Sequence, residues 1–249
     1  MERKYWEKMA PAYDDEIFDV LKNDRKGLIR SALEQRGGVR KSVIDVGCAV
    51  GKWLPLLADN YGRIEAVDIS AGNLAIARQR YGAIKKISFS RSDMSKGTTG
   101  YKGFDVALCV NAVLTDSLVK RTRFFSNLHA CLRKRGTLIL VVPALESWLL
   151  TRIIQHRWKI DKKLFATAIS DKTAAGRYHD IQQGNAEIDQ VATKHYLADE
   201  LMLLLQQEGF EPGQPAKLEY DWSTEFINPP GWLASPRPWD WLVIAQKIR

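Results

Sequence analysis

Apolar runs and helical patterns alternate along most of this chain. The runs predict buried strands at 42–46, 63–67, 87–90, 104–110 and 137–142. The segments between them carry apolar residues at helical spacing and predict helices at 52–59, 71–81 and 117–133. Two further strands are predicted near the end of the chain, at 217–226 and 239–246. Strands that alternate with helices form parallel sheets covered on both faces, so we predict an α/β fold with a doubly wound, mostly parallel seven-stranded sheet.

The pattern on either side of this alternation predicts additional elements. Residues 1–37 carry apolar positions at helical spacing, interrupted near Pro11. Asn23 or Asp24 is suited to cap a second helix, which Gly37 terminates. We therefore expect the first 37 residues to form helices that cap the sheet.

Residues 144–195 form an insertion after the fifth predicted strand. The segment 145–165 has the spacing of an amphipathic helix, and the short runs 177–181 and 191–195 predict a hairpin closed by the loop 182–190. A leucine-rich helix over 196–208 follows. We expect the whole chain, 1–249, to be a single domain in which residues 144–195 act as a lid.

The turn after the first strand is the strongest chemical signal. Asp45 ends an apolar run, and Gly47, Ala49 and Gly51 follow at alternate positions, which is typical of a backbone turn that a ligand approaches closely. A second apolar run ends at Asp68. A small-residue turn with an acid downstream indicates a nucleoside site at the carboxyl edge of a parallel sheet. The dinucleotide fingerprint fits poorly, because two of its three glycine positions are not glycine.

The acid-x-Gly-x-Gly-x-Gly order resembles motif I of the class I S-adenosylmethionine-dependent methyltransferases, with alanine at the middle glycine. Alanine is the smallest substitute that keeps a Cβ, so close approach of a ligand survives if Ala49 avoids positive φ. The resemblance extends from about residue 5 to residue 246 and covers four ordered motifs. It implies S-adenosyl-L-methionine as the cofactor and S-adenosyl-L-homocysteine as the product.

The same resemblance assigns roles to individual residues. In this family, the acid matching Asp68 accepts hydrogen bonds from both ribose hydroxyls, the acid matching Asp93 meets the adenine amino group, and the residue matching Asn111 lies under the methionine part. The amino-terminal helix closes over the methionine end. The residues that the resemblance implies for cofactor binding are Trp6, Tyr13, Asp45, Gly47, Cys48, Ala49, Gly51, Asp68, Ile69, Asp93, Met94 and Asn111.

Methyl transfer from this cofactor requires few catalytic groups from the protein. Methyl transfer is an in-line displacement that needs alignment, water exclusion and, where the nucleophile carries a proton, a base. The candidates for catalysis are His195 and His179 on the two predicted hairpin strands, together with Tyr13 beside the sulfonium. The alternatives left open are that both histidines are hydrogen-bonded structural residues and that Tyr13 only packs its helix.

Composition narrows the function further. The chain has a formal net charge of +8, but its basic residues are spread over several helix ends. The sequence predicts no membrane span, no signal peptide and no metal cluster, and its three cysteines favour a reducing, cytoplasmic location. We expect a methyltransferase that acts on an oxygen or nitrogen of a small molecule. The alternatives are methylation of RNA or protein, for which charge is the only support, and a non-catalytic module that binds S-adenosylmethionine.

Overall fold

The computed structural model describes residues 3–161, 176, 180–188 and 191–248. Its helices are α1 (Arg3–Met9), η1 (Ala10–Ala12), α2 (Tyr13–Glu16), α3 (Val20–Asn23), α4 (Leu28–Arg36), α5 (Leu54–Asn60), α6 (Ala71–Tyr81), α7 (Leu118–Cys131), α8 (Leu145–Trp158), α11 (Ala198–Gln207) and η2 (Trp222–Thr224). Its strands are β1 (Gly38–Val46), β2 (Tyr61–Asp68), β3 (Ile87–Arg91), β4 (Phe104–Val110), β5 (Leu132–Pro143), β6 (Asn185–Ile188), β7 (Val191–Lys194), β8 (Phe210–Pro212), β9 (Ala216–Glu219) and β10 (Trp239–Lys247).

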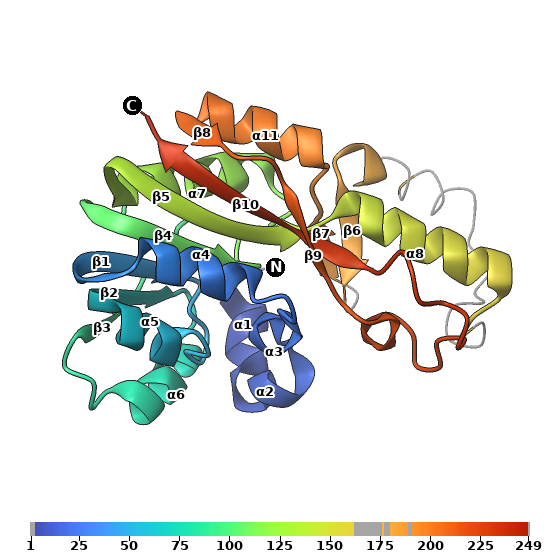
Figure 1. The fold of residues 1–249 in the computed structure, drawn as a ribbon, viewed down its shortest axis with the longest axis horizontal. Coiled ribbons are helices and arrows are strands. Elements are labelled where there is room, and N and C mark those ends of the chain that lie inside the picture. The colour runs from blue at the N-terminus through green and yellow to red at the C-terminus, as the bar shows by residue number, and fades with distance from the viewer. Residues whose placement is uncertain (1–2, 162–175, 177–179, 189–190, 249) are drawn as a thin grey trace.

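A twisted central sheet organises the fold, with strand order β3-β2-β1-β4-β5-β10-β8 and with β9 also paired to β10 (Figure 1). Strands β1 to β5 run parallel to one another, and β10 runs antiparallel to β5. The predicted α/β, mostly parallel architecture is confirmed. The strand order reverses between β1 and β4, so their carboxyl ends form the crevice in which ligands bind in open α/β sheets.

The predicted number of seven strands is wrong by one, because the edge next to β10 is divided. Strand β8 pairs with residues 245–247 of β10, and β9 pairs with residues 239–242. Pro212 and Pro215 interrupt the edge between them, and a proline has no N–H to give to the ladder. The edge therefore consists of two short strands where the sequence suggested one, and the predicted strand 217–226 ends at Glu219.

Two hydrophobic clusters hold the helices on opposite faces of the sheet. On one face, α4, α5 and α6 contribute buried residues such as Leu33, Leu57 and Leu74. On the other face, α7 and α11 contribute Phe125 and Leu201. Burial on both faces explains why the central strands read as continuous apolar runs rather than as alternating ones.

The amino-terminal segment forms several short helices rather than two longer ones. Of these, α4 is the only one longer than seven residues in the described part of residues 1–37. The carboxylate of Asp24 accepts from the backbone N–H groups of Leu28 and Ile29, which fulfils the predicted role of Asp24 as a cap. Figure 1 shows α1, α2 and α3 grouped beside the carboxyl ends of β1 and β2.

The cap region, which we define as α8, the β6–β7 hairpin and residues 220–238, extends beyond the carboxyl ends of the parallel strands (Figure 1). The predicted hairpin exists, but its first strand was misplaced: residues 180–182 are helical and β6 occupies 185–188. Gly184 begins the hairpin where its carbonyl accepts from the N–H of His195, and a Cβ there would lie 2.7 Å from the His195 carbonyl oxygen. His179 lies outside the described residues.

Candidate cofactor and active site

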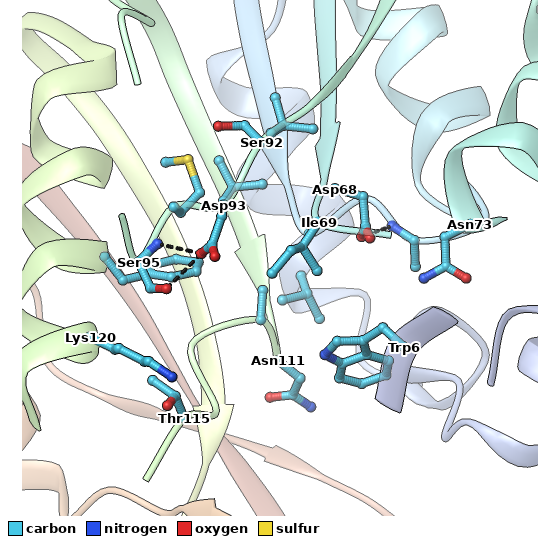
Figure 2. A pocket seen from close by; sticks show the side chains of 18 of the residues that line it. Trp6, Asp68, Ile69, Asn73, Ser92, Asp93, Ser95, Asn111, Thr115 and Lys120 are labelled. Carbon is cyan, nitrogen blue, oxygen red and sulfur yellow. Dashed lines mark hydrogen bonds between the residues drawn. The ribbon is translucent and has the colours of Figure 1, made fainter. Parts of the chain in front are cut away.

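A cavity of about 800 Å³, counted to its open mouth, lies at the carboxyl ends of the parallel strands. Residues from β1, β2, β4, the segment after β3 and the amino-terminal helices line it (Figure 2). The structure brings together in this lining Trp6, Tyr13, Gly47, Ala49, Asp68, Ile69, Asp93, Met94 and Asn111. Nine of the residues that the sequence selected for one ligand therefore surround one space.

Three other residues selected from the sequence lie behind this lining. A Cβ on Gly51 would lie 2.8 Å from Leu54 Cδ1 and 3.0 Å from the ring of Tyr81, so Gly51 allows helix packing rather than ligand approach. Cys48 is buried in the hydrophobic cluster beneath α5. Asp45 is 2% exposed, and its Oδ2 has no hydrogen-bond partner among the described residues.

Asp68 is a buried carboxylate fixed by its own neighbourhood. It ends β2, its Oδ2 accepts from the N–H of Ala49 at 2.9 Å, and its Oδ1 accepts from the N–H of Ser70 at 2.8 Å. Each carboxylate oxygen keeps a second lone-pair direction, so Asp68 can accept further hydrogen bonds from a molecule in the cavity. Burial raises the pKa of Asp68, and the two backbone hydrogen bonds partly offset that effect.

The turn between β1 and α5 depends on small residues. Gly47 has a φ of 79°, and a Cβ on it would lie 2.4 Å from the Cβ of Ala112, so only glycine lets this turn meet the end of β4. Ala49 has a φ of 48°, in the left-handed region, so the condition that it avoids positive φ is not met. The hydrogen bond from its N–H to Asp68 requires the tight turn, and this bond offsets the strain on the alanine Cβ.

A second buried carboxylate lies next to Asp68. Burial, reinforced by the charge of Asp68, raises the pKa of Asp45 to about 7. Near neutral pH, Asp45 is therefore about half protonated in the protein without a ligand. A cation bound close by would favour the ionised carboxylate, since an opposite charge stabilises it.

Asp93 forms the far side of the cavity (Figure 2). Its Oδ1 accepts from the backbone N–H of Ser95 at 3.0 Å and from the Ser95 hydroxyl at 2.6 Å. Burial alone would raise the pKa of Asp93, but these two bonds and the ammonium of Lys96 bring it below its usual value. Asp93 is therefore an ionised hydrogen-bond acceptor at neutral pH.

Asn111 sits at the end of β4 with a φ of 47°, a conformation that asparagine tolerates better than most residues. Its side-chain amide donates to Asp240 Oδ2 at 2.8 Å, and the hydroxyl of Tyr220 donates to the same oxygen at 2.9 Å. Asn111 thereby connects the cavity to the first residues of β10 and to the start of the cap region.

Trp6 and Tyr13 bring aromatic faces to the cavity from the amino-terminal helices. Their ring centroids are 6.5 Å apart, and Figure 2 shows Trp6 reaching from its helix toward Asn111. Burial, with a further contribution from the charge of Asp68, raises the pKa of Tyr13, so its phenol keeps its proton. This direction disfavours Tyr13 as a general base.

His195 directly follows β7 of the cap region and is not among the residues that line the cavity. The residue is 4% exposed, and its Nδ1 lies 3.0 Å from the carbonyl oxygen of Thr193, which accepts from it when Nδ1 carries the proton. Burial lowers the pKa of His195 to about 4. His195 is thus a neutral, weakly basic side chain near pH 7.

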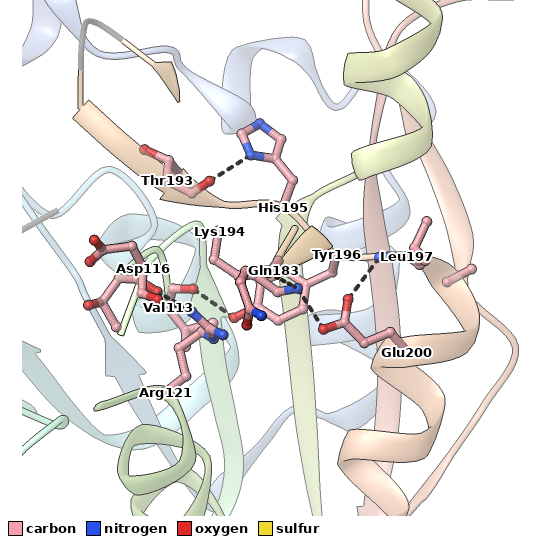
Figure 3. A network of polar contacts seen from close by, with 12 residues as sticks. Val113, Asp116, Arg121, Gln183, Thr193, Lys194, His195, Tyr196, Leu197 and Glu200 are labelled. Carbon is pink, nitrogen blue, oxygen red and sulfur yellow. Dashed lines mark hydrogen bonds and ion pairs between the residues drawn. The ribbon is translucent and has the colours of Figure 1, made fainter. Parts of the chain in front are cut away.

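The network around Lys194 attaches the hairpin to the core (Figure 3). The side chain of Lys194 is 2% exposed, and its ammonium donates to Glu200 Oε1 at 2.6 Å and to the carbonyl oxygen of Gln183 at 3.1 Å. Its Nζ also lies 4.9 Å from the ring centroid of Tyr196. Burial lowers the pKa of Lys194, and the carboxylate of Glu200 works against that shift.

The sequence did not point to several polar residues that line the cavity. They are Asn73, Ser92, Ser95, Thr115 and Lys120. Thr115 and Lys120 follow the end of β4, the edge at which ligands bind in this architecture, so their position after a strand could have singled them out. The described residues contain no group of His, Cys, Asp and Glu side chains able to hold a metal ion.

All three cysteines are free and buried thiols. In the part of the chain that the structure describes, every helix is too short or too polar to cross a bilayer.

The chain is similar to known methyltransferases in sequence. The family described as a methyltransferase domain matches residues 43–136. A Geobacillus sp. (strain WCH70) protein named as a methyltransferase is 29% identical over 143 residues, which cover 55% of this chain and 57% of that protein. The Streptomyces fradiae dTDP-3-amino-3,6-dideoxy-alpha-D-glucopyranose N,N-dimethyltransferase is 36% identical over 72 residues, or 26% of this chain and 28% of the relative. The matches thus span about half or less of these relatives' lengths.

The fold is shared with solved methyltransferase structures. The Burkholderia thailandensis 1,6-didemethyltoxoflavin-N1-methyltransferase, with bound 1,6-didemethyltoxoflavin and S-adenosylhomocysteine, superposes with a TM-score of 0.62 at 17% identity. This comparison covers 99% of this chain and 87% of that one. Residues 43–136 are thus similar in sequence to a methyltransferase domain, and the sheet order and fold are those of solved methyltransferase structures.

Proposed function

We propose that this protein transfers the methyl group of S-adenosyl-L-methionine to an oxygen or nitrogen atom of a small molecule. The observation that carries the proposal is the cavity at the carboxyl ends of β1, β2 and β4, in which Asp68 presents a fixed and buried carboxylate. The lining also fits a positively charged, adenosine-containing molecule, because it combines the carboxylates of Asp68 and Asp93 with aromatic faces.

Different residues of the cavity would bind different parts of the cofactor. Asp68 would accept hydrogen bonds from the ribose hydroxyls, and Asp93 would accept one from the adenine amino group. Asn111 and the turn at Gly47 would bound the methionine part, while Asp45, just behind the lining, would complement its positive charge. When bound, the cofactor supplies an electrophilic methyl group on a sulfonium. The protein's contribution is to align that group, stabilise its charge and exclude water.

An aromatic face near a sulfonium stabilises the cation by about 0.5–2 kcal/mol. Trp6 and Tyr13 are the described aromatic residues of the cavity that can supply such a face, besides Phe124 on α7. We therefore place the methyl group on the side of the cavity that the amino-terminal helices cover.

We expect the acceptor to bind between the end of β4, whose residues line the cavity, and the neighbouring cap region. The names of two of the similar proteins describe methylation of nitrogen on small molecules, an amino sugar nucleotide and a fused heteroaromatic compound. These similarities support a small-molecule acceptor and make nitrogen compounds the first to test. The catalytic roles expected of His195, His179 and Tyr13 stay predictions, and the pKa directions of Tyr13 and His195 favour an acceptor that needs no strong base.

The experiment is a transfer assay with S-adenosylmethionine labelled in its methyl group. The purified protein is incubated with amino sugar nucleotides, heteroaromatic N–H compounds, phenols and total RNA, and labelled products are separated by mass. We expect label in a small molecule and no transfer by the Asp68→Ala variant. Label in RNA, lost at higher salt, would replace the small-molecule assignment. Cofactor binding without transfer to any member of the panel would favour a non-catalytic module.

A further inference from the structure

Helix α1 forms one wall of the cavity without being buried itself. No residue of α1 is buried, yet Trp6 reaches from it into the cavity lining (Figure 2). A seven-residue helix with no buried side chain is not stable on its own. Contacts made from α1 to the rest of the protein must therefore decide where Trp6 lies.

Glu7 makes the most specific of these contacts. Its Oε1 accepts from the backbone N–H of Ala71 at 2.9 Å, and its Oε2 accepts from the N–H of Gly72 at 3.0 Å. Oε2 also accepts from the hydroxyl of Ser70 at 3.0 Å. The first N–H groups of a helix have no partner within the helix, and a carboxylate there gains both charge-assisted hydrogen bonds and a favourable dipole.

The packing at this junction leaves little room. A Cβ on Gly72 would lie 3.0 Å from the Cβ of Ala10 and 3.3 Å from Glu7 Oε2, so the glycine lets the two segments approach. The backbone hydrogen bonds from Ala71 and then Gly72 lower the pKa of Glu7, which is ionised at neutral pH. The guanidinium of Arg91 lies 3.9 Å from Glu7 Oε1, an exposed ion pair that adds little.

The contact between Glu7 and the start of α6 is also linked, through Ser70, to Asp68 in the lining of the cavity. Ser70 donates its backbone N–H to Asp68 Oδ1 at 2.8 Å, and its hydroxyl donates to Glu7. The Ser70 hydroxyl oxygen also accepts from the N–H of Asn73 at 3.1 Å, as the cap of α6. The carboxylate expected to hold the ribose and the helix that carries Trp6 are thus joined through a single serine.

We propose that Glu7 is a positioning residue whose carboxylate clamps α1 to the amino-terminal end of α6, so that Trp6 stays against the cofactor cavity and release of the clamp controls how fast the cofactor product leaves. The clamp follows from contacts in the protein alone. Its effect on the cofactor rests on the proposed function.

Limited proteolysis of the ligand-free protein tests the clamp. Trypsin cleaves after Lys8, inside α1, only when the helix opens, so the cleavage rate reports the open population. We expect Glu7→Ala to accelerate this cleavage roughly fivefold to tenfold, the usual effect of losing a helix cap. Glu16→Ala, which removes an exposed carboxylate of α2, is the matched control and should cleave like the wild type. Equal cleavage rates of wild type and Glu7→Ala would overturn the clamp.

The dissociation rate of S-adenosylhomocysteine tests whether the Glu7 clamp controls how fast the product leaves. In stopped-flow displacement measurements, we expect the product to dissociate from Glu7→Ala faster than from wild type by a similar factor, while the melting temperatures of the two proteins stay close. Unchanged dissociation would remove the gating role even if proteolysis supports the clamp. A wild-type protein that binds no S-adenosylhomocysteine by calorimetry would contradict the proposed function, and the proteolysis result would still decide on the clamp.

Discussion

The part of the cavity lining around Gly47, Ala49 and Asp68, which we call the cofactor side, and the cap region are built in different ways. On the cofactor side, Asp68 is held by backbone N–H groups that belong to its own strand end and to the adjacent turn. In the cap region, the contacts join segments far apart in the sequence. Trp241 Nε1 donates to Glu146 at 3.0 Å, and the N–H of Ile227 donates to Asp161 at 2.8 Å.

This difference has a functional consequence. The cofactor side depends on short stretches of sequence around Gly47 and Asp68, and its geometry is set by the sheet. The cap region has its own small cluster of buried residues, including Ile154, Trp222 and Phe226. We therefore expect substitutions in the cap region to change its own packing while leaving the lining of the cavity intact.

The buried carboxylate of Asp45 should produce the largest effect on stability. Its pKa is about 7 in the folded protein and 3.8 as its ordinary value, so the folded state keeps a proton that the unfolded state releases between these values. The contribution of Asp45 to wild-type stability should fall as pH rises from about 4 to about 7, by at most about 4 kcal/mol. Asp45→Asn should lack this loss, so its advantage over wild type in urea unfolding should grow up to pH 8.

Asp59→Asn is the control for this experiment, because Asp59 is an exposed carboxylate on α5. It should follow the wild-type pH dependence. A constant difference between Asp45→Asn and wild type from pH 4 to pH 8 would show that Asp45 does not titrate as described.

Lys194→Met should separate the two regions most clearly. The substitution keeps the side-chain volume but removes the ion pair with Glu200 and the bond to Gln183. Because Glu200 is partly exposed and can regain water, we expect a loss of about 2 kcal/mol in the free energy of unfolding. Calorimetric affinity for S-adenosylhomocysteine should change less than about twofold, since no cofactor-side contact is removed. A large loss of affinity would mean that the cap region and the cofactor side are energetically coupled.

Ala49→Gly tests strain on the cofactor side. Alanine holds a φ of 48° at this position, and glycine adopts that region without a Cβ penalty. We expect thermal unfolding to show a gain of about 1 kcal/mol, with the bond from residue 49 to Asp68 kept. Ala58→Gly, within α5, should instead destabilise the protein, because there the backbone is helical. A destabilised Ala49→Gly protein would argue against strain at this turn.

His195→Gln should have the smallest effect on the cofactor. Glutamine can still donate to the Thr193 carbonyl, and His195 does not line the cavity. We expect unchanged affinity for S-adenosylhomocysteine and turnover within about threefold of wild type, because a group with a pKa of about 4 is a weak base near neutral pH. A loss of turnover of a hundredfold with intact binding would restore His195 as the general base.

The sequence predicted the parallel core well because its signals are local, and the motifs whose residues meet around the cavity are local in the same way. About ten residues of sequence are enough to recognise each apolar run of β1, β2, β4 and β5, and the same is true of the turn after Asp45. The glycine requirement at Gly47 also has a local signature, although its cause, the approach of Ala112, is visible only in the structure.

The cap region was predicted less well because long-range contacts decide its elements. Gly184 and Asn185 look like loop residues in the sequence, but β6 begins at Asn185, directly after Gly184 passes close to His195. Likewise, the edge next to β10 is divided by Pro212 and Pro215, and the predicted strand stops early at Glu219. The positive φ of Ala49 likewise depends on a contact outside its own motif, because the bond that stabilises it reaches across to Asp68.

The most direct test of the account is the affinity of S-adenosylhomocysteine for wild type, Asp68→Ala and the control Asp59→Ala, measured by titration calorimetry at pH 7.5. We predict that Asp68→Ala weakens binding roughly a hundredfold, because two ribose hydroxyls lose a charged acceptor, while Asp59→Ala binds like wild type. Equal affinities for wild type and a folded Asp68→Ala protein would contradict the assignment of this cavity to the cofactor.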